Sequence, residues 1–418
     1  MASPTAPEHP FRQSILHELH ARAIEPVPER SRVRRLVFVA SPESSEVSEA
    51  LARLRTWCVD EGVPAPSEQG RQHTFEVRSL RVTWEFHTEF ISVTWTAPLD
   101  DADNLPEGIG LETLTESRLI GATRIDVIDD DRIPERLIPG FRSNSLCLVD
   151  VEGGRAQLVT DFVADDALFI RFEFAAGRLN PLRRAIVVRR LLEIETYRTM
   201  ALLGLPLARQ HAPALRNLEL ELSAGMGSLS DATTTDTAQA ALARLHDLSV
   251  RSGQLSERLS YRFAASQAYG DIVLTRLASL DESPTGNGST LSRYIGNRVD
   301  PALHTLEAME KRLDVLSGKI ERAVELLNVR IGLDLQLQNK EVLETIAETA
   351  QSQFRLQRTV EGLSTIAISY YVLAVIGYAF AEPFHLFNVS KTLVLSILAP
   401  VVLLGVWLMV RSVRKKHF

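Results

Sequence analysis

Two uncharged stretches near the C-terminal end constrain this chain more than any other feature of its sequence. Residues 363–381 and 392–410 are each 19 residues long and contain no Asp, Glu, Lys or Arg. Because an α-helix rises about 1.5 Å per residue, each stretch would reach about 28 Å, close to the hydrocarbon thickness of a bilayer. The sequence therefore predicts two transmembrane helices joined by a short loop at residues 382–391.

The basic residues beside these stretches predict how the chain crosses the membrane. They precede the first stretch and follow the second, at Arg355, Arg358, Arg411, Arg414, Lys415 and Lys416. The positive-inside rule then places both flanks in the cytoplasm and the loop outside. Residues 1–35 contain no apolar run, so no signal peptide is expected. Forty Arg against six Lys suggest a GC-rich bacterial genome, so we expect a bacterial inner-membrane protein with two spans and both termini in the cytoplasm.

Residues 1–178 have the pattern of a cytoplasmic α/β domain. Runs rich in Val, Ile, Thr, Phe and Trp, bounded by turn residues, are typical of strands. They occur at residues 33–40, 72–80, 82–86, 90–95, 122–128, 145–151, 156–163 and 167–174. Helices are predicted at residues 11–23 and at residues 46–60, where Val47, Leu51, Leu54 and Cys58 share one face. The expected fold is a mixed sheet with flanking helices.

The chain from residue 179 onward is predicted to be helical. Residues 179–299 would form a helical region with a polar linker at 224–236, the first arm of a long antiparallel hairpin, and a turn at 281–289. Residues 300–362 would form the stalk helix, followed by the span 363–381, the loop 382–391, the span 392–410 and the basic tail 411–418. Leu306, Leu313, Ile320 and Leu327 recur every seven residues, with Met309, Leu316 and Ala323 three positions later, which indicates a coiled-coil seam.

The length of the stalk helix favours a homo-oligomer. A helix of that length cannot bury its apolar stripes alone, so it must pack on the first arm and on neighbouring copies. The alternative is a monomeric hairpin that satisfies the seam internally. Two spans alone make a poor transporter but a suitable subunit of a symmetric assembly.

The first span carries candidate pore-lining residues. Ser364, Tyr371 and Tyr378 follow one another at seven-residue intervals and so share a face. Polar groups in a bilayer favour interior or water-lined positions. The alternative is that the hydroxyl groups bond back to their own helix and the tyrosines lie at the membrane interface.

The loop between the spans adds candidates at the outer end. Glu382 of several copies would concentrate cations, as acidic rings do in cation channels. The alternative for Glu382 is an ordinary charged residue that ends a membrane segment. His385 and Asn388 are further polar candidates in the loop.

Signals for other functions are weak in this sequence. We find no nucleophile–base set for an enzyme and no metal-binding motif, and the two cysteines form no metal pattern. Acidic runs such as Asp129, Asp130 and Asp131 could bind Mg²⁺ but fit solvated turns better. The net charge of −7 disfavours nucleic acid as a partner. The expected cofactor is therefore none, with a divalent cation such as Mg²⁺ as the candidate ligand.

An N-terminal motif resembles the opening of a bacterial family, the domain of unknown function 3422. The motif consists of His9, Pro10, Phe11 and Arg12, followed by Glu18, Leu19, His20, Ala21 and Arg22. The family usually has Asn and Pro at the positions of His17 and Ala23. The resemblance extends over nearly the whole chain, including the spans, and implies no activity.

The order of elements also resembles the CorA-type divalent cation transporters. Those proteins join an α/β cytoplasmic domain to a helical hairpin, a long helix that enters an inner span, an outer span and a basic tail. The resemblance implies a pentamer around the first spans. Residues 360–367 are similar in character to the start of their inner span. The Gly-Met-Asn motif of that family is replaced here by residues 377–383, Gly-Tyr-Ala-Phe-Ala-Glu-Pro, so no site residue is carried over.

These observations predict an oligomeric membrane protein of CorA-like design that acts as an ion channel or a divalent cation transporter with a cytoplasmic sensing domain. The alternative function is a membrane-anchored sensor or scaffold without transport activity, and the missing motif favours it. The lipid bilayer, further copies of the chain and ions are the expected partners.

Overall fold

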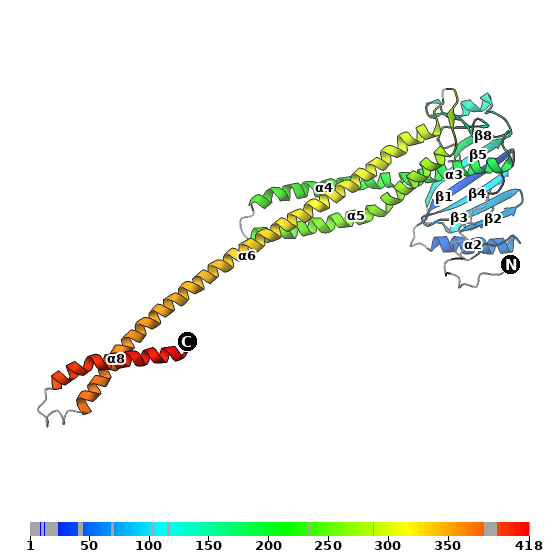
Figure 1. Ribbon diagram of the computed structural model, residues 1–418. Helices are drawn as coiled ribbons and strands as arrows, with labels where there is room; N and C mark the ends of the chain where they lie inside the picture. The colour runs from blue at the N-terminus through cyan, green and yellow to red at the C-terminus, as the bar shows by residue number, and fades with distance from the viewer. Residues whose placement is uncertain are drawn as a thin grey trace, which may run out of the picture. The chain divides into compact units, whose positions relative to one another are not determined.

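A computed structural model describes residues 9, 12, 24–40, 45–67, 71–101, 104–114, 118–231, 235–286, 288–379 and 391–417 (Figure 1). The chain divides into two compact units. The first unit comprises Met1–Ser228 and Ala243–Arg322, and the second comprises Leu229–Leu242 and Ala323–Phe418. The predicted helix at residues 11–23 lies outside the described residues except for Arg12, as do Glu382, His385 and Asn388.

A mixed sheet of nine strands, counted over the described residues, forms the centre of the first unit. Its strands are β1 (Ser31–Val39), β2 (Gln72–Val77), β3 (Leu80–Phe86), β4 (Phe90–Pro98), β5 (Arg118–Ile128), β6 (Cys147–Val151), β7 (Ala156–Thr160), β8 (Ile170–Ala175) and β9 (Ser283–Pro284). Their order is β2-β3-β4-β1-β5-β8-β7-β6-β9. The pair of β5 and β8 is parallel, whereas β1 is antiparallel to both β4 and β5. The predicted mixed sheet is thus confirmed.

The helix α2 (Glu46–Asp60) covers one face of the sheet, as its apolar spacing predicted. Ala50, Leu54 and Cys58 recur every four residues, are fully buried, and pack with Trp84 and Trp95 of the sheet. The acidic residues Glu46 and Glu49 lie in the first turn of the helix, where negative charge is favourable.

The helix α3 (Pro181–Leu202) packs on the opposite face. Its start follows from Asn180, whose side chain accepts a hydrogen bond of 2.9 Å from the backbone N–H of Arg183, and from Pro181 in the first turn. Val37 of β1 packs with Met200 of α3. Because neighbouring residues of a strand point to opposite faces, Leu36 packs instead with the α2 cluster.

The helices α4 (Gly204–Asp231), α5 (Thr235–Ala278) and α6 (Leu291–Ala379) form a bundle within the first unit. Arg251 of α5 binds Glu221 of α4 at 2.8 Å, and Arg312 of α6 binds Glu219 of α4 at 2.6 Å. The predicted seam is confirmed, because each of its residues is at most 5% exposed: Leu306, Met309, Leu313, Leu316, Ile320, Ala323 and Leu327. Burial of each large apolar side chain contributes roughly 1.5–3 kcal/mol.

Two sequence predictions in this region are wrong. Residues 224–231, predicted to belong to a polar linker, continue α4. Their Gly and Ser content lowers helix propensity, but the helix is already started by the packing of Leu215, Leu218 and Leu222. Residues 283–284, predicted as part of a turn, form β9 and pair with β6 through Asp150 and Val149. A strand of this length carries no periodicity that a sequence could show.

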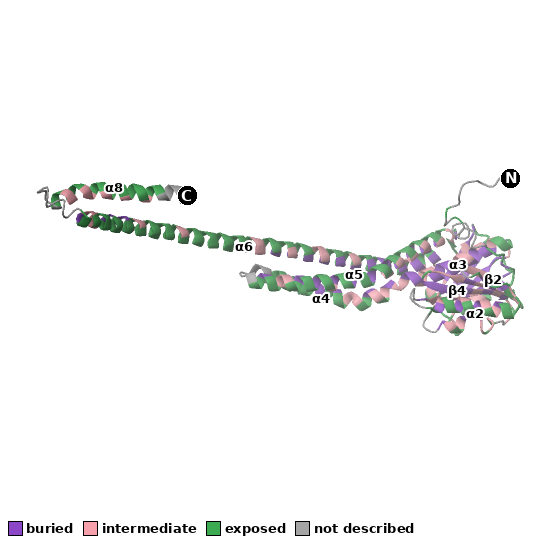
Figure 2. Ribbon diagram, turned by 90° about the horizontal axis from the view of Figure 1, so that it is seen from below, coloured by how far each residue is buried: buried purple, intermediate pink, exposed green. Residues whose placement is uncertain are grey.

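The second unit contains the rest of α6 and the helix α8 (Lys391–His417). Beyond residue 328, side chains of α6 are mostly exposed, including Val342, Ile346 and Val360 (Figure 2). The helices α6 and α8 each contain a segment that is long and apolar enough to cross a membrane. This finding agrees with the two apolar stretches of the sequence.

Candidate functional site: the apolar segment of α6 and the pocket beside Ser364

The apolar segment of α6 buries one face composed of small residues. Thr365 and Ser369 are 8% and 2% exposed, and Gly377 is also buried. The Thr365 hydroxyl donates to the Glu361 carbonyl at 2.9 Å, and the Ser369 hydroxyl donates to the Thr365 carbonyl at 2.7 Å. These two hydroxyl groups thus bond back to their own helix. Small residues allow close approach of helices in a membrane, which suits packing against α8.

The predicted pore-lining residues lie on an exposed face of the same segment. Ser364 is exposed, and the side chains of Tyr371 and Tyr378 are 68% and 81% exposed. Tyr371 also contacts the ring of Tyr370, with 5.9 Å between the ring centroids. Ser369 lies five residues from Ser364, about 140° around the helix, which separates the exposed face from the buried one.

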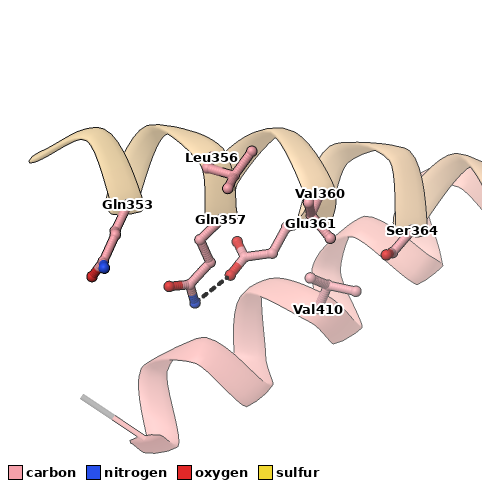
Figure 3. Close-up of a pocket in the computed structure, with 7 residues that line it drawn as sticks. All are labelled: Gln353, Leu356, Gln357, Val360, Glu361, Ser364 and Val410. Carbon is pink, nitrogen blue, oxygen red and sulfur yellow. Dashed lines mark hydrogen bonds between the residues drawn. The ribbon is translucent and has the colours of Figure 1, made fainter. Parts of the chain in front are cut away.

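A pocket of about 390 Å³ lies at the start of the apolar segment (Figure 3). The residues that line it come from α6, except for Val410 of α8: Gln353, Leu356, Gln357, Val360, Glu361, Ser364 and Val410. The Gln357 side-chain amide donates to the Glu361 carboxylate at 3.1 Å. Ser364 is thus the predicted site residue that the structure brings into a pocket, whereas Gln357 and Glu361 had no predicted role in a site.

This pocket offers few of the ligands that a metal ion needs. It offers the Glu361 carboxylate, the amides of Gln353 and Gln357 and the Ser364 hydroxyl beside an apolar wall. Mg²⁺ binds through several oxygen atoms in an octahedral arrangement, and one carboxylate supplies few of them. Over the described residues, no group of three His, Cys, Asp or Glu is placed to hold a metal ion. The acidic run at Asp129–Asp131 includes Asp131, which binds Arg178 at 2.7 Å instead.

The remaining candidates, Glu382, His385 and Asn388, lie outside the described residues. Their roles therefore stay predictions from the sequence. Gln357 and Glu361 could have been paired by their spacing, since residues four apart on a helix are neighbours on its surface.

Comparisons with known proteins agree with the resemblance seen at the N-terminus. No curated protein and no solved structure matches the chain. The sequence model of one family, described as "Protein of unknown function (DUF3422)", matches residues 7–417. This match includes the sheet, the helical bundle and both apolar segments. The chain therefore belongs to the DUF3422 family.

Proposed function

We propose that this chain is one subunit of a homo-oligomeric membrane protein of CorA-like design that conducts cations. In this proposal α6 crosses a bacterial inner membrane near a common axis, α8 crosses it on the lipid side, and both termini are cytoplasmic. The α/β unit would sense a ligand. A pentamer is the assembly that the CorA resemblance favours.

One continuous exposed face of α6 supports this proposal most strongly. Val342, Val360 and Tyr378 follow one another at intervals of 18 residues. Because 18 residues make five full helical turns, the three side chains share one face. Their side chains are 56%, 53% and 81% exposed. The pairs Ile346 and Ser364, and Gln353 and Tyr371, have the same spacing and flank this face. We call these seven residues the α6 face.

The composition of the α6 face changes along its length. Before the apolar segment it carries Val342, Ile346 and Val360, with Gln353 between them, so it is mainly apolar in a region where water would otherwise surround the helix. Exposed apolar side chains repeated along a helix favour association with another helix. Within the apolar segment the same face carries Ser364, Tyr371 and Tyr378, whose hydroxyl groups are costly against lipid. Both halves are therefore best accommodated by contact with other copies around an axis.

Cation flux follows from the polarity of this face and its ends. Hydroxyl groups along the axis can replace part of the water shell of a cation. Copies of Glu382 at the outer end, and of Glu361 beside the pocket, would give negative charge near both ends of the pathway. Negative charge near a pore mouth raises the local concentration of cations.

Reconstitution into liposomes tests this function. We would purify the full chain in detergent, measure its oligomeric state by mass, and record fluxes of Mg²⁺, Zn²⁺, K⁺ and Cl⁻. We expect an oligomer and a cation flux that Glu382→Gln reduces, while Glu344→Gln on the opposite side of α6 leaves it unchanged. A confirmed oligomer that passes none of these ions would rule out conduction, and a monomer would rule out the assembly.

A membrane-anchored sensor or scaffold is the second candidate function. The stretch Gly-Tyr-Ala-Phe-Ala-Glu-Pro at residues 377–383 supports it, because it lacks the ion-entry motif of CorA-type transporters. Here the α6 face would assemble the protein without forming a pathway. An oligomer without flux, together with a stoichiometric partner recovered from the membrane fraction, would favour this function.

A further inference from the structure

A pocket of about 270 Å³ lies at the end of the sheet where β1 and β3 begin and β4 ends. The buried residues at its base are Ser31, Leu80 and Ala97, which belong to β1, β3 and β4. These strands are neighbours, with β4 between β1 and β3 (Figure 1). Two walls rise beside this base: residues 28–30, which precede β1, and residues 76–79, around the turn between β2 and β3. The pocket therefore belongs entirely to the first unit.

Hydrogen bonds fix the first wall, although it has no regular secondary structure. The buried guanidinium group of Arg184 in α3 donates to the Val27 carbonyl at 3.1 Å and to the Glu29 carboxylate at 2.8 Å. The backbone N–H of Leu99, directly after β4, donates to the Arg30 carbonyl at 2.8 Å. A wall that is already held in place loses little conformational freedom when a ligand binds.

Two arginines that line the pocket have a left-handed backbone conformation. The φ angle is 52° at Arg30 and 55° at Arg78. This conformation favours glycine, and a larger residue is strained in it. Arg78 belongs to the two-residue turn between β2 and β3, where Gly, Asn or Asp is usual. Residues strained in this way are concentrated at ligand-binding sites, and here both carry a guanidinium group beside one pocket.

The charges of the lining leave Arg78 without a counter-ion. Glu76 binds Arg81 at 2.8 Å, and Glu29 binds the buried Arg184 at 2.8 Å. Both carboxylates of the lining therefore already have a cationic partner. Arg78 is exposed and forms no ion pair or hydrogen bond with any residue that the structure describes. All five N–H donors of its guanidinium group are thus available to a ligand.

Arg30 adds a second cation on the other side of the pocket. Its guanidinium group donates to Asp100 at 2.9 Å, and the two side chains are 60% and 77% exposed. Such an exposed pair contributes little stability, so a ligand can compete with it. β1 and β3 lie on either side of β4 and are therefore two strand spacings apart, roughly 10 Å. Because Arg30 precedes β1 and Arg78 precedes β3, the two arginines approach the pocket from different sides.

We propose that this pocket binds a small dicarboxylic acid, with one carboxylate on Arg78 and the other on Arg30. The planar guanidinium group matches a carboxylate through two parallel hydrogen bonds. The carbon chain between the carboxylates lies over the apolar base at Leu80 and Ala97. The volume is slightly below the range of about 300–1,000 Å³ for small-molecule sites, which favours a short chain.

The spacing of the two arginines also separates this ligand from a phosphate. A phosphate concentrates its negative charge on one group and would engage one wall, whereas a dicarboxylic acid distributes it between both. The inference rests on the proposed function only for the role of the α/β unit as a sensor, and it names the class of ligand that would be sensed.

Thermal unfolding of the full chain in detergent, with glutarate as the probe, tests the site. We expect glutarate to raise the unfolding midpoint of the wild type. Cadaverine, a diamine of the same chain length, and sodium chloride at equal ionic strength should leave the midpoint unchanged. Inorganic phosphate should bind at least tenfold more weakly than glutarate.

Two substitutions locate the site. Arg78→Gln should weaken the apparent affinity for glutarate at least tenfold. Arg136→Gln is the matched control, because Arg136 is also exposed and without a partner in the described part of the chain, but lies outside the pocket. It should keep the wild-type response.

A further variant separates binding from folding. Arg78→Gly removes the guanidinium group together with the backbone strain at this position. It should lose the response to glutarate, while its midpoint without ligand is at least that of the wild type. Equal responses of the wild type and Arg78→Gly would overturn the proposal. So would a wild type that does not respond to glutarate, or one that responds equally to phosphate or to sodium chloride. These measurements involve no ion flux, so failure of this site and failure of conduction are separate results.

Discussion

The backbone N–H of Gly204 donates a hydrogen bond to Ser266 Oγ at 3.1 Å, where α3 ends and α4 begins. Ser266, on α5, is fully buried. A Cβ added at Gly204 would lie 2.7 Å from Ser266 Oγ and 2.6 Å from Leu306 Cδ1 of α6. Glycine at this position thus lets α4, α5 and α6 approach one another at the end of the bundle that adjoins α3.

We expect Gly204→Ala to destabilise the protein by about 1–3 kcal/mol, because Ser266 is too short to move away from the added methyl group. Gly253→Ala in α5 is the matched control, since a Cβ there meets nothing within 4 Å. It should stabilise the chain by up to about 1 kcal/mol through helix propensity. Denaturant unfolding of the full chain measures both. A Gly204→Ala variant as stable as Gly253→Ala would contradict the close approach.

Local periodicity predicted most of the fold but not how distant strands pair. The four-residue spacing of Leu54 and Cys58 and the seven-residue spacing of Leu306 and Leu313 each report one buried face, and all four residues are buried. What periodicity cannot report is the register between distant strands. The opposition of Arg34 and Arg124, 90 residues apart in sequence, exists only once β1 pairs with β5.

The sequence also predicted part of the candidate site, namely the shared face of its polar residues. Ser364, Tyr371 and Tyr378 share a face because their spacing matches the helical repeat, and they lie on an exposed face in the structure. These three residues share a face with Val342 and Val360 only because α6 is one helix through residues 291–379. The sequence predicted the stalk helix and the span one after the other, and the structure joins them in a single helix, although Gly332 has low helix propensity.

The two cysteines should be inert in the folded protein. Cys58 and Cys147 are fully buried, and burial raises the pKa of the Cys58 thiol to about 11 and that of Cys147 to about 12. Because the thiolate is the reactive form, each should react with a maleimide at pH 8 at least roughly a hundredfold more slowly than an exposed thiol. Mass spectrometry should show two labels after denaturation and none before it. Rapid labelling of the native chain would contradict this burial.

The stability of the first unit should fall as pH rises toward neutrality because of Glu173. Its pKa is raised to about 7 by burial and by Asp126, whereas an exposed Glu titrates near 4.3. Between these two values the folded chain holds a proton that the unfolded chain has lost, so rising pH favours unfolding. The contribution is fully present below about pH 4 and is lost as pH rises to about 7.

Glu173→Gln should therefore stabilise the protein at pH 8, by up to about 3 kcal/mol, and have little effect at pH 4. Unfolding midpoints at the two pH values measure the difference. Asp131→Asn is the control, since Arg178 holds the pKa of that exposed carboxyl below its usual value and gives the opposite slope at acid pH. An identical pH profile for the wild type and Glu173→Gln would show that Glu173 titrates normally.

Copies of the chain should meet along the α6 face. Val342 and Glu344 are both exposed, yet they lie two residues apart and so point about 200° apart around the helix. Val342→Cys should form disulfide-linked dimers when membranes are mildly oxidised. A disulfide spans roughly 4.4–6.8 Å between Cα atoms, and we expect the two copies of residue 342 in neighbouring chains to come this close. Glu344→Cys, on the far side, should crosslink several-fold less.

Comparing Val342→Cys with Glu344→Cys distinguishes a specific contact between copies from random collision. Both cysteines would be equally accessible to water in an isolated chain, so collisions in the membrane would crosslink them at similar rates. The native thiols do not interfere, because Cys58 and Cys147 are buried. Non-reducing electrophoresis of the two variants, with Val342→Cys and Glu344→Cys expressed at the same level, gives the ratio directly. Equal crosslinking would exclude the α6 face as the contact between copies, and with it the axial position of Ser364, Tyr371 and Tyr378.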